Sequence, residues 1–148
     1  MQFAPRNHAL GFANRTRKNL EFIEEAYKED KDVHVVTQVA ISLLGLIVFP
    51  KEKLSLEEHL DKISLNSLLQ EGWPQWEILQ GTCETLYDLV KHLRNAASHS
   101  HLYFSSNSRV MEEVDIEVKD RHWQARICVK ELRDFCLRFI DLLEARLS

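Results

Sequence analysis

The chain has 148 residues, of which 45% are apolar and 28% charged, and its formal net charge is −4. These values are typical of one globular domain covering residues 1–148, and they exclude a low-complexity chain or a polycation that coats nucleic acid. The three cysteines are odd in number and scattered, which excludes a disulfide framework and indicates a reduced, cytoplasmic protein. The most apolar run, 39–49, has 11 residues, whereas a membrane-spanning helix needs about 20. We therefore expect no membrane anchor and no secretion signal.

Two long helices are predicted in the first third of the chain. The first covers about 14–29, where three residues form one apolar stripe: Leu20, Ile23 and Tyr27. The second has Asp32 as its N-cap and ends near Phe49, since Pro50 is expected to stop it. Because this second helix is apolar nearly all round, we expect it in the middle of a helical bundle.

Charge is unevenly distributed at the N-terminal end. Residues 1–20 hold four basic residues and no acidic one, whereas residues 21–32 are mostly acidic. A basic patch of this kind can guide a phosphate backbone, and three of its members are candidate substrate-binding residues: Arg15, Arg17 and Lys18. The competing interpretation is a solvated helix start without a ligand.

The segment 50–76 contains shorter elements. Ser55 and Glu58 in SLEEHL have the spacing of a capping box, which predicts one or two short helices before Gly72. The sequence EGWPQW at 71–76 then interrupts the chain, and its two tryptophans are expected to cover one end of the core.

The second half of the chain changes between helical and strand periodicity. A helix over about 82–98 carries a buried stripe: Leu86, Leu89, Val90, Leu93 and Ala97. Two runs of alternating apolar residues, 114–119 and 123–129, flank a turn at KDRH and predict an antiparallel hairpin. A last amphipathic helix over about 130–147 turns five residues inward: Leu132, Phe135, Phe139, Leu142 and Leu143. The predicted fold class is mainly α, a helical bundle of four main helices with a β-hairpin inserted before the C-terminal helix.

The stretch LRNAASH at 93–99 places Arg94 and His99 five residues apart, near a helix end. At 100° per residue, Arg94 lies on the flank of the apolar stripe, and one polar stripe opposite the core is formed by Asp88, His92, Asn95 and His99. Arg94 and His99 then diverge by about 140°. They can converge on one substrate in two ways: the helix loosens near Ser98, or a second copy of the motif faces the first across a dimer.

This pair suits the cleavage of RNA without a metal. His99 can take a proton from a 2′-hydroxyl or give one to the leaving 5′-oxygen. Arg94 stays protonated and can bind the charge that develops on the phosphorane. Asn95 can hold His99 in one tautomer or bind a phosphate oxygen, His92 is a further candidate proton carrier, and Lys91 is a candidate substrate contact. The competing interpretation is an accidental motif at a helix C-terminus, which favours cations in any case.

The sequence HLRNAASHSHLYF, followed by VDIEVKDRHWQARICVKELRDFCLRFIDLL, resembles the HEPN superfamily of small helical nucleases. It is most similar to the plasmid-borne HEPN branch, in which the motif helix leads into a hairpin and a final helix. The HEPN signature is an arginine, a polar residue, three variable residues and a histidine, and it is matched here by Arg94, Asn95 and His99. The similarity is strongest over about 82–147.

The resemblance implies a homodimer whose composite site is formed by two motifs. It implies a metal-independent endoribonuclease without a cofactor, which leaves a 2′,3′-cyclic phosphate and serves as a toxin or defence effector, with an antitoxin protein as a further partner. A related branch carries a tyrosine two residues after the histidine, which an antitoxin nucleotidylates. Here Tyr103 lies two residues beyond that register. Ser98, His101 and Tyr103 are therefore candidate supporting residues, and for His101 and Tyr103 the favoured interpretation is the start of a strand.

Three other functions stay open at this point. A HEPN-like dimer can bind RNA, nucleotides or a partner protein without cutting. A structural bundle can carry the motif by accident. A metallohydrolase that uses His92, His99 and His101 is disfavoured, because these residues lack a set of carboxylates and a ligand spacing that suits a helix.

Overall fold

The fold is described from a computed structural model over residues 5–54 and 57–147. The helices of this part of the chain are α1 (Pro5–Lys28), α2 (Val35–Leu54), α3 (Glu57–Leu60), α4 (Leu65–Gln70), α5 (Leu86–Ser98) and α6 (Val129–Leu147). Its strands are β1 (Glu77–Gln80), β2 (Leu102–Phe104), β3 (Asp115–Asp120) and β4 (Trp123–Cys128), and a short 3-10 turn covers Met111–Glu113.

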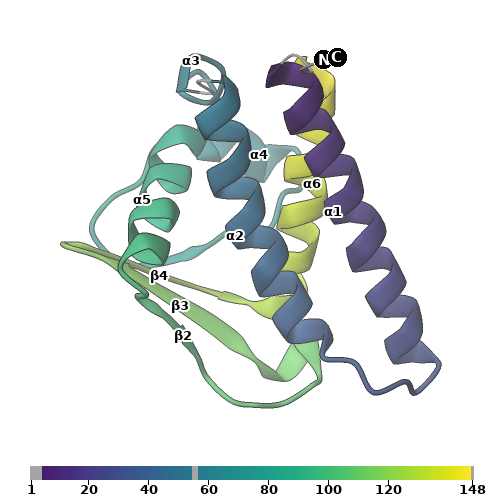
Figure 1. Cartoon of the computed structure of the whole chain (residues 1–148). Coiled ribbons are helices and arrows are strands. Elements are labelled where there is room, and N and C mark those ends of the chain that lie inside the picture. Colours follow the sequence, from purple (N-terminus) through teal and green to yellow (C-terminus); the bar gives the residue numbers. More distant parts are fainter. Residues whose placement is uncertain (1–4, 55–56, 148) are drawn as a thin grey trace.

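The four long helices α1, α2, α5 and α6 form the predicted bundle (Figure 1). Helix α2 contacts the other three, which confirms its expected place in the middle. None of the helices in the described ranges is both long and apolar enough to cross a membrane.

The predicted ends of the first two helices were wrong. Helix α1 begins at Pro5 instead of residue 14, because its buried side includes Ala9 and Ala13, which are too small to stand out as an apolar stripe. Helix α2 is capped by the ring Nδ1 of His34, 3.3 Å from the backbone nitrogen of Thr37, and not by Asp32. It also continues past Pro50 to Leu54. A proline in a helix interior removes one backbone hydrogen bond and crowds the carbonyl four residues before it, which commonly ends a helix, but α2 continues through it.

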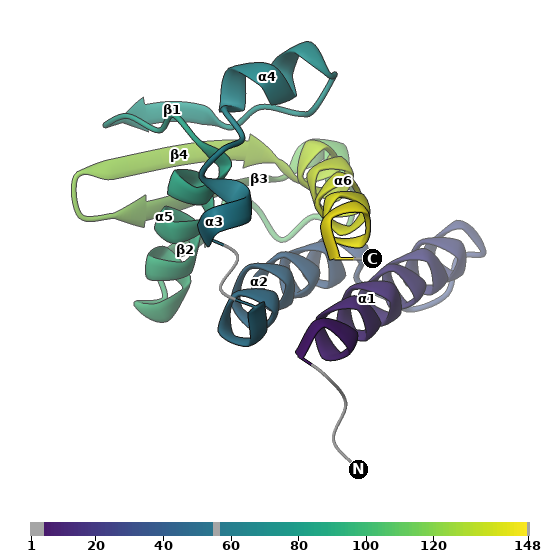
Figure 2. The same cartoon turned by 90° about the horizontal axis from the view of Figure 1, so that it is seen from above.

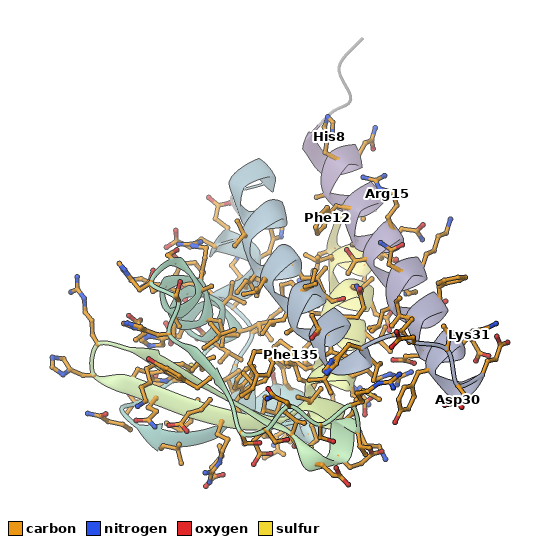
Figure 3. All side chains as sticks on the ribbon, turned by 60° about the horizontal axis from the view of Figure 1, so that its bottom comes forward. His8, Phe12, Arg15, Asp30, Lys31 and Phe135 are labelled. Carbon is orange, nitrogen blue, oxygen red and sulfur yellow. The ribbon has the colours of Figure 1, made fainter. Side chains whose placement is uncertain are left out.

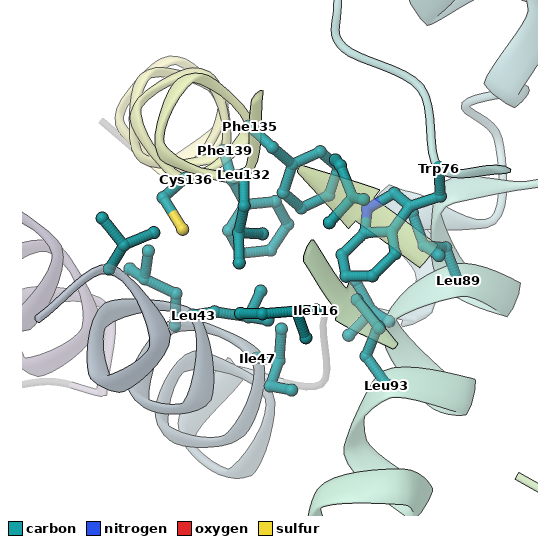
Figure 4. Close-up of a cluster of buried hydrophobic side chains, with 14 of the residues drawn as sticks. Leu43, Ile47, Trp76, Leu89, Leu93, Ile116, Leu132, Phe135, Cys136 and Phe139 are labelled. Atoms are coloured by element: carbon teal, nitrogen blue, oxygen red, sulfur yellow. The ribbon is translucent and has the colours of Figure 1, made fainter. Parts of the chain in front are cut away.

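The short elements follow the sequence more closely. Helices α3 and α4 occupy the segment in which one or two short helices were predicted, although Ser55 of the proposed capping box lies outside the described residues. Trp73 and Trp76 are both 8% exposed and meet the ring of Phe135 edge-on, at centroid distances of 5.6 and 6.1 Å. The two tryptophans therefore close the core beside α6, as expected. Figure 4 shows Trp76 beside Phe135.

The hairpin is part of a larger sheet. Strands β3 and β4 pair antiparallel across a turn at Arg121 and His122, which confirms the predicted hairpin. Two further strands extend the hairpin: β1 pairs with β4, and β2 pairs with β3, to give the order β1-β4-β3-β2. The sequence analysis missed β1, which is exposed along its whole length, and it expected strand residues at Tyr103 but not that β2 is a separate strand of 3 residues. In Figure 2, β1 lies beside β4 and α5 lies against the sheet.

One continuous core joins the helices to the sheet. Figure 4 shows Phe135 and Phe139 of α6 near Ile116 of β3, with Leu43 of α2 and Leu89 of α5 around them. Two predicted inward positions shift slightly, since Ala96 is buried where Ala97 was expected, and Leu142 is only half-buried. The three cysteines are free; Cys136 is buried, whereas Cys83 and Cys128 are half-buried.

Candidate active site

Helix α5 carries the motif, and its first turn is fixed by a capping box. The Thr85 hydroxyl accepts the backbone N–H of Asp88 at 3.1 Å, and the Asp88 carboxylate accepts the backbone N–H of Thr85 at 3.2 Å. The helix therefore starts after Thr85 instead of near Thr82. Asp88 is engaged in the cap, which accounts for an acidic residue on the polar stripe.

The end of α5 is fixed by its own backbone. Ser100 adopts a left-handed conformation with φ 57°, and its N–H donates to the Ala97 carbonyl at 3.1 Å. The next N–H, of His101, donates to the Ala96 carbonyl at 2.8 Å. This is a Schellman-type ending, which satisfies carbonyls of the last turn. The helix stays regular through Ser98, so the structure does not use the first of the two routes that would bring Arg94 and His99 together.

A groove of about 840 Å³ runs beside α5. Its wall on the motif side is formed by Lys91, His92, Asn95, His99 and His101. The facing wall comes from the β3–β4 turn, with Asp120, Arg121, His122 and Trp123. The groove thus gathers four histidines, a lysine and an arginine, and it unites five of the residues singled out from the sequence.

The hairpin covers part of the polar stripe, so the expectation that this whole stripe faces away from the packed protein was wrong. The imidazole of His92 lies parallel to the Trp123 ring, with centroids 4.5 Å apart and planes 4° apart. Its Nδ1 is 2.8 Å from Oδ2 of Asp120. The Asn95 amide donates to the same oxygen at 3.4 Å, so Asn95 contacts Asp120 instead of His99.

Asp120 and Trp123 are site residues that the sequence analysis missed. Asp120 is 9% exposed and is in phase with the buried Ile116 and Val118 of β3. A buried carboxylate needs hydrogen-bonding partners, and His92 and Asn95 supply them. The sequence analysis assigned Asp120 to the turn KDRH, and the signal available was that it continues the alternation of Ile116 and Val118 by one step. Within 5–54 and 57–147, no group of three or more His, Cys, Asp or Glu side chains could hold a metal ion.

Arg94 lies outside the groove lining that the structure describes. Its Nη1 is buried and has no hydrogen-bond partner among the described residues. The guanidinium lies near Tyr87: desolvation by burial and the neighbouring Glu57 raise the pKa of this phenol, whereas Arg94 acts in the opposite direction. His99, in contrast, is exposed, and its ring centroid is 6.0 Å from that of His101. One chain therefore does not bring the arginine and the histidine to a common point.

The predicted supporting residues lie at the end of α5 and just after it. The Ser98 hydroxyl donates to the Arg94 carbonyl at 3.0 Å. Tyr103 belongs to β2, as the favoured interpretation held, and its ring faces the ammonium of Lys119 at 5.3 Å from the centroid. His101 immediately precedes that strand and lines the groove.

The predicted basic residues of α1 lie across α2 from α5. Arg15 and Lys18 line a separate groove between α1 and α2. Figure 3 shows Arg15 on α1. Arg17 forms ion pairs with Asp141 and Glu144 of α6, both at 2.7 Å. Its guanidinium therefore links two helices of the bundle.

Comparison with known proteins identifies the family. The family model described as HEPN pEK499 p136 matches residues 3–147, which is nearly the whole chain. No curated protein and no solved structure gives a significant match. The match agrees with the mainly helical fold and with the resemblance to the plasmid-borne branch. The chain belongs to the HEPN pEK499 p136 family.

Proposed function

We propose that the protein is a metal-independent endoribonuclease whose active site is completed by a homodimer. The observation that carries the proposal is the state of Arg94, whose Nη1 is buried without a hydrogen-bond partner among the described residues. An unpaired buried donor of a charged group is costly, and a phosphate oxygen would satisfy it. Because Arg94 and His99 lie on different sides of a regular helix, a second copy of the motif is the route by which both reach one phosphate.

The chemistry assigns one role to each residue of the signature. An imidazole of His99 removes the proton of a 2′-hydroxyl, whose oxygen then forms a bond to phosphorus, or, when protonated, gives its proton to the 5′-oxygen as the P–O5′ bond breaks. The products are a 2′,3′-cyclic phosphate and a 5′-hydroxyl. Arg94 binds the charge on the phosphorane. Asn95 keeps an amide N–H that its contact with Asp120 does not use, and this N–H is free to bind a phosphate oxygen.

The composition of the groove supports an anionic substrate. Lys91 and Arg121 contribute positive charge on opposite walls, and the neighbouring histidines add charge when protonated. Asp88 and Asp120 also line the groove and balance the charges of Lys91 and Arg121, so the groove is formally positive only when its histidines are protonated. Two sets of residues stay predictions. The supporting residues are Ser98, His101 and Tyr103, and the contacts of a longer RNA are Arg15, Arg17 and Lys18.

The dimeric site can be tested by complementation. We expect Arg94→Ala and His99→Ala to be inactive alone, and their mixture, after subunit exchange, to recover about a quarter of the wild-type activity, because half of the dimers are mixed and each has one intact site. A site built within one chain would recover nothing. Arg126→Ala, on the outer face of the sheet, is the control for loss of an arginine.

In the cell, such a nuclease would act as a toxin or defence effector, with an antitoxin protein as a partner. Growth arrest on expression of the wild type, and not of His99→Ala, is the expected result. The alternative function is a dimer that binds RNA, nucleotides or a partner protein without cutting, and the acidic net charge favours it. A gel shift in which the protein binds the RNA and the RNA stays intact would support that alternative.

A further inference from the structure

The imidazole of His92 is held in one orientation by contacts from the hairpin. Trp123, which is 3% exposed, covers one face of the ring at a centroid distance of 4.5 Å. The buried carboxylate of Asp120 holds Nδ1 at 2.8 Å. A carboxylate oxygen can only accept, so Nδ1 carries a proton in this contact. Two separate elements of the fold, α5 and the β3–β4 hairpin, therefore fix the ring.

The rest of the ring is available to a ligand. The His92 side chain is 28% exposed and lines the groove. Because Trp123 covers one face and Asp120 covers the Nδ1 edge, a ligand in the groove can approach the ring only from the opposite face or the Nε2 edge. The arrangement is a flat aromatic surface, backed by a second ring, at the wall of a groove that also carries Lys91 and Arg121.

The distance between His92 and His99 separates their roles. The two residues are two helical turns apart on nearly the same side of α5, which corresponds to about 10.5 Å along the axis. A general acid and a general base of one phosphodiester must both approach its oxygens to about 2.6–3.2 Å. A spacing of two turns suits neighbouring groups of a nucleotide chain better than two oxygens of one phosphate.

We propose that His92, backed by Trp123 and anchored by Asp120, is a stacking platform for a nucleobase next to the scissile phosphate. Aromatic side chains bind bases of single strands in this way, with little dependence on base identity. Asp120 is a positioning residue, which acts through the orientation of His92. The proposal rests on RNA being the substrate, and it assigns His92 to binding instead of proton transfer.

The test uses oligonucleotides that cannot be cleaved. Fluorescence anisotropy would measure the affinity of the full-length protein for a short 2′-deoxy oligonucleotide and for a series in which each base in turn is replaced by an abasic site. At one position we expect the abasic replacement to weaken binding by about 10- to 100-fold. His92→Ala should remove this difference, whereas His92→Phe, which keeps an aromatic ring, should retain it. Asp120→Ala should reduce it.

Two results would overturn the platform: an affinity that no abasic replacement changes, or His92→Phe that behaves like His92→Ala. Failure of the proposed function is separate, because the oligonucleotide has no 2′-hydroxyl to attack. A protein that binds bases through His92 but cuts no RNA contradicts only the nuclease. One that cuts RNA without a base-dependent contribution of His92 contradicts only the platform.

Discussion

Gly81 and His122 are in close backbone contact, since a Cβ added to Gly81 would lie 2.7 Å from the carbonyl oxygen of His122. Gly81 also has φ 82°, a conformation that other residues adopt at a cost. We expect Gly81→Ala to destabilise the protein by about 2 kcal/mol or more in urea unfolding, through the combined strain and clash.

Gly72→Ala is the matched control for this substitution. Gly72 has φ 88°, but its added Cβ would meet only the end of the Arg138 side chain, at 3.7 Å. It should therefore show the backbone cost of about 1 kcal/mol without the clash. Equal losses in the two variants would mean that the contact with His122 contributes nothing.

We expect Arg121 to strengthen RNA binding and to lower the stability of the fold. It is a non-glycine residue with φ 45° in the turn between β3 and β4, and it lines the groove. Arg121→Gly should stabilise the fold by about 1 kcal/mol, because the left-handed conformation then costs less. It should also weaken RNA binding and reduce the slope of log Kd against log salt by about 0.7, as one phosphate contact is lost. A weaker fold, or an unchanged salt slope, would contradict this account of the turn.

The motif variants have expected magnitudes in a cleavage assay with labelled RNA and EDTA. His99→Ala should lower the rate about 10²–10⁴-fold through loss of an acid–base group. Arg94→Ala should lower it about 10²–10³-fold through loss of charge stabilisation. Because His99 is exposed, the circular dichroism spectrum of the His99→Ala variant should match that of the wild type. Equal cleavage by wild type and His99→Ala would remove the basis of the nuclease assignment.

Alkaline pH should destabilise the protein through a buried thiol. Burial raises the pKa of Cys136 to about 12. In the unfolded chain a cysteine titrates near about 8.5, so only the unfolded state is stabilised by deprotonation between these values. The contribution of this thiol to the free energy of unfolding is fully present below about pH 8.5. Above that pH the free energy of unfolding falls by up to about 1.4 kcal/mol per pH unit, until the folded thiol titrates.

The measurement is urea unfolding at about pH 7.5 and about pH 10, compared between wild type and Cys136→Ala, because other groups titrate in both proteins. The variant starts from a lower stability but should lose less of it on going to the higher pH. Parallel losses would show that the Cys136 thiol does not contribute.

The sequence predicted those features that depend on a regular period. Alternation identified the hairpin, since Ile116, Val118, Ala125 and Ile127 are all buried. The 100° rule placed His92, Asn95 and His99 on one side of α5, and all three line the groove. What it missed depends on pairing over long range, as between His92 and Asp120, which are 28 residues apart. Periodicity within one element contains no information about which strand end lies over which helix.

The ending of α5 has a consequence for the spacing of the signature. Hydrogen bonds from Ser100 and His101 to the carbonyls of residues 97 and 96 close the helix from within six consecutive residues, so His99 is held at the groove by its own neighbours. One extra residue between Arg94 and His99 would then change the angle between the two side chains by about 100° around the helix axis. The number of residues between the arginine and the histidine therefore sets the direction in which the guanidinium points relative to the imidazole.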